Sequence, residues 1–238
     1  MADSIVRQTS RLYDRIAVDF DDNRTTSQDF TALSHYVKAQ DLVLDIGCGN
    51  GRLAVALRSS SINMIGLDGS AELVKIARKN NAEDIAVGWL GFVNFSMFDM
   101  PFDGHQFDVI FMMAVLHHTP SEHLRLQLLR HIHTISKVGA TFIGSVWNLR
   151  GSVFQGRYGL AAELAAPRAG YDLGDVHVPW KTHGADESRY CHAFELDELR
   201  ALFEKTGWRV IRLEGVDRNF NSAKLDDALN IFWELRAE

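Results

Sequence analysis

The sequence feature that most constrains the fold is a group of three glycines directly after a short apolar run. The run that contains Asp45 leads into Gly47, Gly49 and Gly51 at alternate positions, and a helix-compatible run, 52–57, follows. A strand, a glycine turn and a helix N-terminus in this order let the backbone approach a small ligand with an anionic group. The Gly-x-Gly-x-Gly spacing differs from the Gly-x-Gly-x-x-Gly fingerprint of dinucleotide-binding proteins.

Apolar runs alternate with helical patterns through the middle of the chain, which predicts an α/β fold. Strands are expected at residues 42–46, 63–68, 92–96, 107–113 and 141–147. Helices are expected at 51–58 and 70–80. A third helix is expected to begin at the capping box Thr119-Pro120-Ser121-Glu122, which has proline at the first helical position, and to end at Gly139. Repeats of this length imply parallel strands with right-handed crossovers.

The length of 238 residues indicates a single domain built around this core. Its expected parts are N-terminal helices (1–40, helical at 4–20 and 28–38), a ligand-binding core (41–148), an insert (149–194), and a C-terminal helix with an antiparallel strand pair (195–238, strands 209–213 and 229–235). The insert has six glycines between residues 148 and 190 and no clear period. A stretch of this length and composition is expected to be functional or locally disordered.

The charge distribution limits the partners. A net charge of −6 gives no global basic field, and DNA is not expected as a partner. From His117 to Arg150 there are four Lys or Arg against one acid, Glu122, which fits a solvated helix face or a local phosphate-contacting patch. No apolar run reaches the ~18 residues of a membrane-spanning helix, so no membrane association is expected.

Cysteine and histidine usage gives no metal signature. Cys48 and Cys191 make neither a disulfide framework nor a zinc quartet, and a reduced, cytoplasmic setting is expected. Five of the ten histidines lie between His117 and His133, but the helical pattern scatters them and no cysteine is close in sequence. Because zinc needs converging ligands, no metal site is expected.

The candidate ligand-binding residues follow the carboxyl ends of the expected strands, where open α/β sheets bind ligands. They are Asp45, Gly47, Cys48, Gly49, Gly51, Asp68, Gly69, Ser96, Met97 and Ala114. Asp45 can help fix the loop and the amino end of a ligand. Asp68 can accept hydrogen bonds from both hydroxyls of a ribose, although Asp68-Gly69-Ser70 also fits a plain turn in which Ser70 caps the next helix.

Residues 40–148 resemble a class I S-adenosylmethionine (SAM)-dependent methyltransferase. The resemblance rests on the glycine turn, on Asp68 and on the block from Phe107 to His118. It implies a Rossmann-like, seven-stranded, mostly parallel sheet with an antiparallel last strand, helices on both faces, and SAM as cofactor. Many such enzymes carry Asp where Ser96 stands, so the Ser96 hydroxyl or the Met97 N–H would contact adenine.

Segments outside this core extend the resemblance to the tRNA wobble-uridine methyltransferases, including the methyltransferase part of the AlkB-family fusion protein. These segments are Tyr13–Ala17 with Phe20 and Arg24, Ala114–His118, Val146–Trp147, Val178–Trp180, Arg189–Phe194 with Glu198–Leu199, and Gly215–Asn219. The resemblance implies methylation of the carboxylate of 5-carboxymethyluridine in the tRNA anticodon loop, giving the methyl ester. Cys191 and Val216 depart from the family, which tends to carry aromatics there, and 220–227 is an extra stretch.

The expected substrate-site residues are Arg24, Arg189, His117, Tyr190 and His192. One of the two arginines is expected to hold the carboxylate, because a guanidinium donates two parallel hydrogen bonds. His117, together with the histidine after it, would face the substrate. Tyr190 and His192 would orient the base or ribose.

Each of these residues also fits a structural role. Arg24 fits the surface of a polar linker, Arg189 fits an ion pair with Glu187, and Tyr190 with Phe194 fits a core helix face. Trp180 in the insert is expected to stack on a base of the substrate.

Two other functions fit the core. One is methylation of a small molecule such as a quinone, sterol or short acid. The other is a module that binds SAM without catalysis, or an activator subunit of another enzyme. The family's eukaryotic members work with a small zinc-binding activator that covers an exposed sheet edge, which implies such a partner here. The apolar stretch Val87–Val93 fits that edge and fits a buried third strand equally well.

Overall fold

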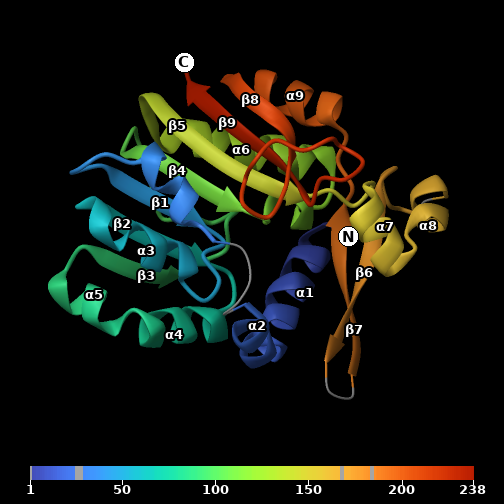
Figure 1. Cartoon of the computed structure of the whole chain (residues 1–238), viewed down its shortest axis with the longest axis horizontal. Helices are drawn as coiled ribbons and strands as arrows, with labels where there is room; N and C mark the ends of the chain where they lie inside the picture. The colour runs from blue at the N-terminus through green and yellow to red at the C-terminus, as the bar shows by residue number, and fades with distance from the viewer. Residues whose placement is uncertain (1, 25–28, 167–168, 183–184) are drawn as a thin grey trace.

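A seven-stranded sheet forms the centre of the molecule in the computed structural model, which describes all residues except 1, 25–28, 167–168 and 183–184 (Figure 1). In spatial order the strands are β3 (Leu90–Asn94), β2 (Asn63–Asp68), β1 (Leu42–Ile46), β4 (Phe107–Met113), β5 (Ser136–Trp147), β9 (Asn230–Ala237) and β8 (Trp208–Val216). The pairs from β3 to β5 are parallel, while β9 runs antiparallel to both β5 and β8. The expected sheet is therefore confirmed, with β3 starting two residues earlier than predicted.

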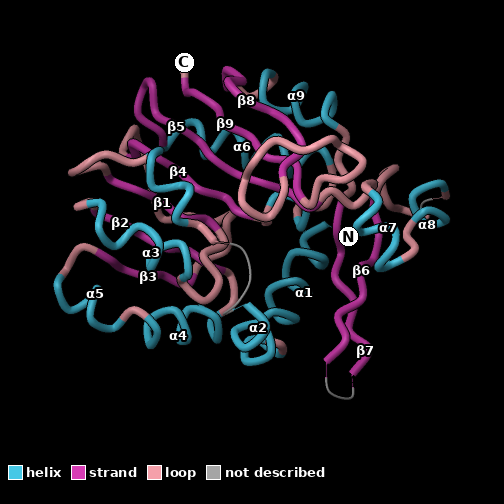
Figure 2. The backbone as a smooth tube through the Cα atoms, viewed as in Figure 1, coloured by secondary structure: helices cyan, strands magenta, loops and turns pink. Residues whose placement is uncertain are grey.

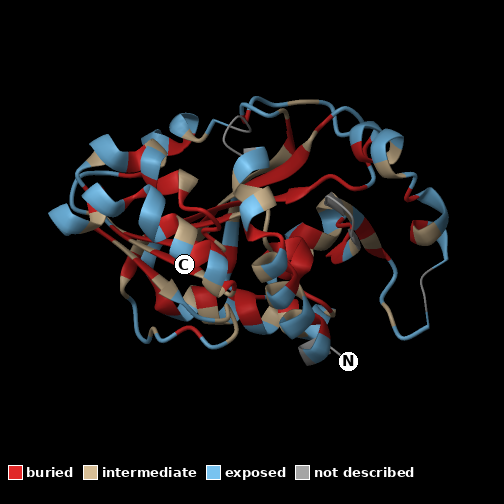
Figure 3. Cartoon of the chain, turned by 90° about the horizontal axis from the view of Figure 1, so that it is seen from below, coloured by how far each residue is buried: buried red, intermediate tan, exposed pale blue. Residues whose placement is uncertain are grey.

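Helices cover both faces of this sheet, as expected. They are α3 (Arg52–Leu57), η2 (Arg58–Ser60), α4 (Ala71–Asn80), α5 (Ala82–Val87), α6 (Glu122–Ile135) and α9 (Leu196–Glu204). Successive residues of a strand point to opposite faces, so Val43 packs with α3 and α4 while Leu44 packs with α6 and α9. Figure 3 shows the buried strands between helices whose outer faces are exposed. In the described residues no helix has the length and apolar character needed to span a membrane.

The N-terminal segment is less regular than its sequence pattern predicts. The helix expected over 4–20 is split into α1 (Ala2–Arg15) and α2 (Ala17–Arg24), which meet at Ile16, a residue only 2% exposed (Figure 2). The helix expected over 28–38 is instead a 3₁₀ helix, η1 (Thr31–Tyr36). Both differences reflect tertiary packing overriding local helix propensity, because Ile16 and Leu33 of η1 are buried.

The start of α6 also differs from the prediction. Ser121, and not Thr119, is the N-cap, and its side chain accepts a hydrogen bond from the Leu124 N–H at 3.4 Å. Thr119 belongs to the preceding 3₁₀ turn, η3 (Leu116–His118), since its N–H donates to Leu116 O and its own carbonyl accepts from Arg125. The helix therefore starts later than the capping-box pattern indicates.

The end of α6 is earlier than Gly139, because β5 already begins at Ser136. Gly139 has φ +76° and lies where the register of β5 against β4 shifts. It therefore serves a β-bulge and does not terminate the helix.

The insert folds as two short helices, α7 (Ser152–Tyr158) and α8 (Ala161–Ala165), followed by a hairpin of β6 (Asp175–Thr182) and β7 (Ala185–His192). It has its own apolar cluster, in which Val176 and Cys191 of the hairpin are fully buried with Leu164 of α8 and Trp147 of β5 nearby. This cluster fixes the hairpin at the end of β5, beside α1 (Figure 1).

Replacement of Gly144 by alanine is expected to destabilise the fold. A Cβ on Gly144 would lie 2.1 Å from the Trp233 ring and 2.7 Å from Met112 O, so the tightly paired centre of the sheet would have to move. We expect a loss of about 1–3 kcal/mol in the free energy of unfolding, as for other overpacked cores, measured by urea denaturation. The matched control is Gly91→Ala in β3, where a Cβ would meet nothing within 4 Å. Equal stability of G144A and wild type would contradict the packing seen here.

Candidate functional site

A cavity opens at the carboxyl ends of β1, β2 and β4, where ligands bind in open α/β sheets. Nine of the ten expected ligand-binding residues line it, namely Asp45, Gly47, Cys48, Gly49, Asp68, Gly69, Ser96, Met97 and Ala114. Gly51 does not line it. The parallel strands thus gather into one site residues that lie far apart in the sequence.

The glycine turn is held open by backbone geometry. Gly47, Gly49 and Gly51 have φ values of +74°, +55° and +82°, which L-residues with a side chain rarely adopt. A Cβ on Gly47 would lie 2.3 Å from a methyl group of Val115, so Gly47 keeps the end of β1 close to the chain after β4. A Cβ on Gly51 would lie 2.9 Å from the Phe92 ring, so Gly51 serves packing of the turn against the sheet.

Asp68 is fixed by the turn that it faces. Its Oδ2 accepts a hydrogen bond from the Gly49 N–H at 2.9 Å, and its Oδ1 accepts from the Ser70 N–H at 2.8 Å. Ser70 in turn caps α4 by accepting from the Leu73 N–H. The turn-and-cap arrangement and a carboxylate lining the cavity therefore coexist, and each oxygen keeps acceptor capacity for a ligand hydroxyl.

Asp45 is a second acid in the cavity and is 3% exposed. Burial, with the nearby negative charge of Asp68, raises the pKa of Asp45 to about 8. Burial also raises the pKa of Asp68. Asp45 is buried and Asp68 beside it is partly exposed, and two acids this close favour a ligand that brings its own positive charge.

The ends of the third and fourth strands complete the wall. Ala114 has φ +58°, and its N–H donates to Ser145 O at 2.9 Å, which bends the chain after β4 into the cavity. Ser96 is less free to contact a ligand, because its hydroxyl already accepts from the Phe98 N–H at 3.2 Å. The neighbouring Met97 lines the cavity beside it.

Helices α1 and α2 cover the cavity, a feature that periodicity did not reveal. Tyr13 and Phe20 line it, and a Cβ on Gly49 would touch the Phe20 ring at 3.4 Å. The Asp14 carboxylate accepts from the Ser70 hydroxyl at 2.7 Å and from the Glu72 N–H at 3.1 Å, which fastens α1 to the start of α4. The signal in the sequence was Tyr13-Asp14 itself, which only the family resemblance singled out.

The structure separates the two adjacent histidines. His118 lines the cavity, whereas His117 lies behind it with its ring stacked on Trp147 at 4.7 Å. The Nδ1 of His118 lies 2.9 Å from Tyr190 O, which can only accept, so this nitrogen carries the hydrogen. The Nε2 is then the acceptor for the Tyr13 hydroxyl, also at 2.9 Å.

Arg189 is the most unusual charge near the cavity. It is 2% exposed, and its guanidinium lies between the rings of Trp147 and Trp180, 4.6 Å from each centroid. Its Nε and Nη1 are buried and have no hydrogen-bond acceptor among the described residues. Glu187 does not pair with it, since that acid binds Arg15 at 2.8 and 3.0 Å.

Trp180 holds Arg189 and also stacks on Phe20 at 6.3 Å. The Trp180 indole therefore already has two protein neighbours, which leaves less room for the base stacking expected from the sequence. Arg24, the last residue of α2, has a side chain outside the described part of the structure.

Tyr190 and His192 lie on the opposite face of β7 from Arg189, because successive residues of a strand alternate in direction. The Tyr190 hydroxyl donates to Asp175 Oδ1 at 2.6 Å, and His192 contacts Asp175 and Glu198. Neither residue lines the cavity. The substrate residues expected from one short block are thus divided between two sites.

Three of the potential metal ligands are close in space. The ligand atoms of His117, His118 and Cys191 lie within 4.8 Å of one another, so a cysteine that is distant in the sequence lies beside two of the histidines in the fold. The nearest pair is Cys191 Sγ and His118 Nδ1 at 3.7 Å, and that nitrogen carries the hydrogen given to Tyr190 O. Burial raises the pKa of the Cys191 thiol to about 12. The Cys191 thiol is therefore protonated at neutral pH, and Arg189 is its charged neighbour.

Comparison with known proteins agrees with this geometry. Residues 20–213 match the family described as "Methyltransferase domain". The chain is 28% identical to the tRNA (carboxymethyluridine(34)-5-O)-methyltransferase of Schizosaccharomyces pombe, covering 88% of this chain and 91% of that one. It is 26% identical to a putative methyltransferase of Encephalitozoon cuniculi, covering 86% and 89% respectively.

Solved structures show the same fold at lower identity. A SAM-dependent methyltransferase from Methanosarcina mazei has a TM-score of 0.67 at 20% identity, covering 86% of this chain and 96% of that one. The [4+2]-cyclase SpnF has a TM-score of 0.69 at 15% identity, covering 98% and 96%. The fold therefore accommodates different reactions, and the acceptor has to be inferred from the site.

Binding of SAM is expected to release a proton from Asp45. In the free protein its pKa of about 8 keeps the carboxyl mostly protonated at pH 7, and the positively charged ligand favours the carboxylate. Calorimetry in buffers of different ionisation enthalpy will then show a binding heat that depends on the buffer. With Asp45→Asn this dependence is expected to disappear and affinity to fall. A buffer-independent heat in the wild type would rule out this coupling.

Proposed function

Since this chain belongs to the SAM-dependent methyltransferase family that it matches over residues 20–213, we propose that it methylates a carboxylate, that of 5-carboxymethyluridine at the wobble position of tRNA. The donor follows from the family. The acceptor is inferred from Arg189, which does not line the cavity itself but packs on Trp147 of its lining, and from the names of the relatives.

The observation that carries the proposal is the guanidinium of Arg189 between Trp147 and Trp180. A buried cation is costly unless it is paired and hydrogen-bonded, and within the described residues the Nε and Nη1 hydrogens have no acceptor. The guanidinium carbon lies 4.6 Å from the centroid of each indole ring, and indole rings supply no hydrogen-bond acceptor in the guanidinium plane. A substrate carboxylate meets both needs, since it is an anion and accepts hydrogen bonds in the guanidinium plane.

The chemistry requires little from the protein beyond positioning. When bound, SAM would supply a methyl group on a positively charged sulfur: the bond from the methyl carbon to a carboxylate oxygen forms as its bond to sulfur breaks, and the neutral thioether S-adenosylhomocysteine leaves. A carboxylate is already ionised at neutral pH, so no general base is needed. Arg189 would orient the attacking oxygen, while Trp147, Phe20 and helix α1 keep water away from the cavity.

The names of the similar proteins support tRNA as the acceptor. The Schizosaccharomyces pombe relative and a Saccharomyces cerevisiae relative, 25% identical over 71% of this chain, are both named tRNA (carboxymethyluridine(34)-5-O)-methyltransferase. The negative net charge of this chain means that affinity for tRNA would depend on local contacts around the cavity.

We also propose a protein partner at the free edge of β3. This strand pairs only with β2 in the described sheet, and Val87 beside it is 80% exposed, although Leu90 and Phe92 point inward and are 5% exposed. An unpaired edge next to an apolar side chain is a site for strand addition by a small activator protein of the zinc-binding kind.

Labelled SAM with bulk tRNA from a strain that lacks this activity tests the acceptor. After digestion to nucleosides, the label is expected in a methyl ester at the wobble uridine. Arg189→Ala is expected to lower kcat/KM for tRNA by about 10- to 100-fold, the cost of a lost charged hydrogen bond, while SAM affinity stays within about twofold. Arg189→Lys keeps the charge but loses the planar fork, so an intermediate loss is expected.

Arg209→Ala is the matched control, because Arg209 is an exposed residue of β8 paired with Glu238. It should methylate like the wild type. Label that enters only a small-molecule extract would replace tRNA by a quinone, sterol or short acid as the acceptor. An R189A variant with unchanged kinetics would remove the role assigned to Arg189.

A further inference from the structure

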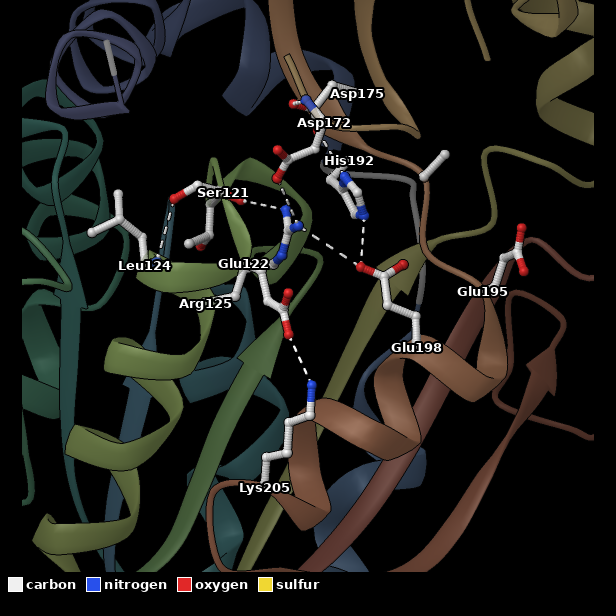
Figure 4. Close-up of polar contacts among 12 residues, drawn as sticks. Ser121, Glu122, Leu124, Arg125, Asp172, Asp175, His192, Glu195, Glu198 and Lys205 are labelled. Carbon is white, nitrogen blue, oxygen red and sulfur yellow. Dashed lines mark hydrogen bonds and ion pairs between the residues drawn. The ribbon is translucent and has the colours of Figure 1, made fainter. Parts of the chain in front are cut away.

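A second group of charged residues is drawn in Figure 4. It lies on the other side of β7 from Arg189, because successive residues of a strand alternate in direction. Its centre is His192, which is 1% exposed. The Nδ1 of His192 lies 2.6 Å from Asp175 Oδ1, and its Nε2 lies 2.8 Å from Glu198 Oε1. Asp175 belongs to β6 and Glu198 to α9, so the imidazole joins the base of the hairpin to the helix that follows it.

These distances define the protonation state of His192. A neutral imidazole has one N–H and can donate to only one of two carboxylates. Both nitrogens contact a carboxylate oxygen, so both carry hydrogen and the ring is an imidazolium. Consistent with this, the hydrogen bonds to Asp175 and Glu198 raise the pKa of His192 against the opposing effect of burial, and they lower the pKa values of both acids.

Other charged groups face the same imidazole. Arg125 of α6 is 2% exposed, and its Nη2 lies 3.3 Å from Asp172 and 3.8 Å from Glu198. Its Nη1 donates to Thr119 O, next to His118. Tyr190 donates its hydroxyl to the same Asp175 oxygen that contacts His192. The group therefore ties β6, β7, α6 and α9 together around one titratable ring.

The same strand carries Arg189, three residues before His192. The carbonyl of Tyr190, between them, accepts from His118, which lines the cavity. A shift of β7 relative to α9 would displace this carbonyl and the guanidinium together, because both belong to the same short strand. The position of Arg189 thus depends on contacts made on the far face of β7.

We propose that His192, held as an imidazolium between Asp175 and Glu198, is a positioning residue that sets the place of Arg189 at the cavity. This inference rests on the carboxylate-binding role proposed for Arg189. Deprotonation of His192 removes one of its two donated hydrogen bonds and loosens the hairpin from α9. Methyl transfer removes the negative charge of the acceptor, so Arg189 stabilises the bound substrate more than the transition state. A less firmly placed Arg189 therefore raises KM more than it lowers kcat.

The direction of the pH effect follows from the raised pKa of His192. The imidazolium contacts are complete at low pH and are lost as pH rises through that raised value. We therefore expect KM for tRNA to rise on the alkaline side, with kcat nearly constant.

The Glu198→Gln variant distinguishes a positioning role of His192 from a role in the stability of the fold. In this variant a neutral imidazole can donate to Asp175 and accept from the introduced side-chain amide, so the contacts survive without the second proton. KM is then expected to stay near the low-pH wild-type value across the alkaline range. His192→Gln cannot satisfy both acids, so KM is expected to be raised about tenfold at every pH, the equivalent of one charged hydrogen bond.

The control is Lys205→Ala, since Lys205 is an exposed cation near the group that pairs with Glu122 and does not contact His192. It should behave as the wild type. Thermal denaturation of each variant at the assay pH identifies any that fail to fold.

A measurement without substrate distinguishes this inference from the proposed function. In nitrogen-15 NMR both ring nitrogens of His192 are expected to be protonated at neutral pH, and the Arg189 Nε signal is expected to shift as His192 titrates, but not in E198Q. A neutral His192 ring at pH 7, or an Arg189 signal that does not change as His192 titrates, would overturn the inference whatever the acceptor is. An Arg189 signal that follows His192, in a protein that leaves tRNA unmethylated, would support positioning and refute only the tRNA acceptor.

Discussion

The hydrogen bonds between the glycine turn and the end of β2 are the interaction on which the rest of the site depends. The N–H groups of Gly47 and Cys48 both donate to Leu67 O, at 2.7 and 3.0 Å, and that of Gly49 donates to Asp68. These bonds use the donors at the end of β1 to orient a carboxylate on the neighbouring strand. The other side of the turn faces the cavity, which Phe20 and α1 cover.

The N-terminal helices join the glycine-turn side of this cavity to the β6–β7 hairpin. Asp14 fastens α1 to the start of α4 beside Asp68, Tyr13 contacts His118, and Arg15 pairs with Glu187 on the hairpin. Phe20 of α2 stacks on Trp180, which in turn covers Arg189. The exposed Arg15 pair contributes little by itself, since surface ion pairs are worth about 0–1 kcal/mol. Together these contacts place the hairpin relative to the glycine turn.

Because successive side chains of β7 point in opposite directions, the two faces of this strand carry different chemical groups. Arg189 and Cys191 face Trp147 and His118, while Tyr190 and His192 face the acids around Arg125. One face carries Arg189, which has no carboxylate partner in the described residues, and the other packs against Arg125 of α6 and the carboxylates around it. The first arrangement suits an external anion, and the second suits a fixed support. A shared fold does not make this distinction, as the cyclase of similar structure illustrates.

The sequence by itself determined the parallel sheet and the place of the ligand cavity. Hydrophobic periodicity and glycine spacing are local, and parallel strands bring their carboxyl ends together, so nine of the ten expected ligand-binding residues do line the cavity. Only the tertiary structure decided which polar residues line the cavity. It placed His118 in the cavity and His117 behind it, brought Cys191 to the histidines, and put Tyr190 and His192 on the far side of β7. These outcomes depend on contacts between residues far apart in the chain, and local propensity and spacing carry no information about such contacts.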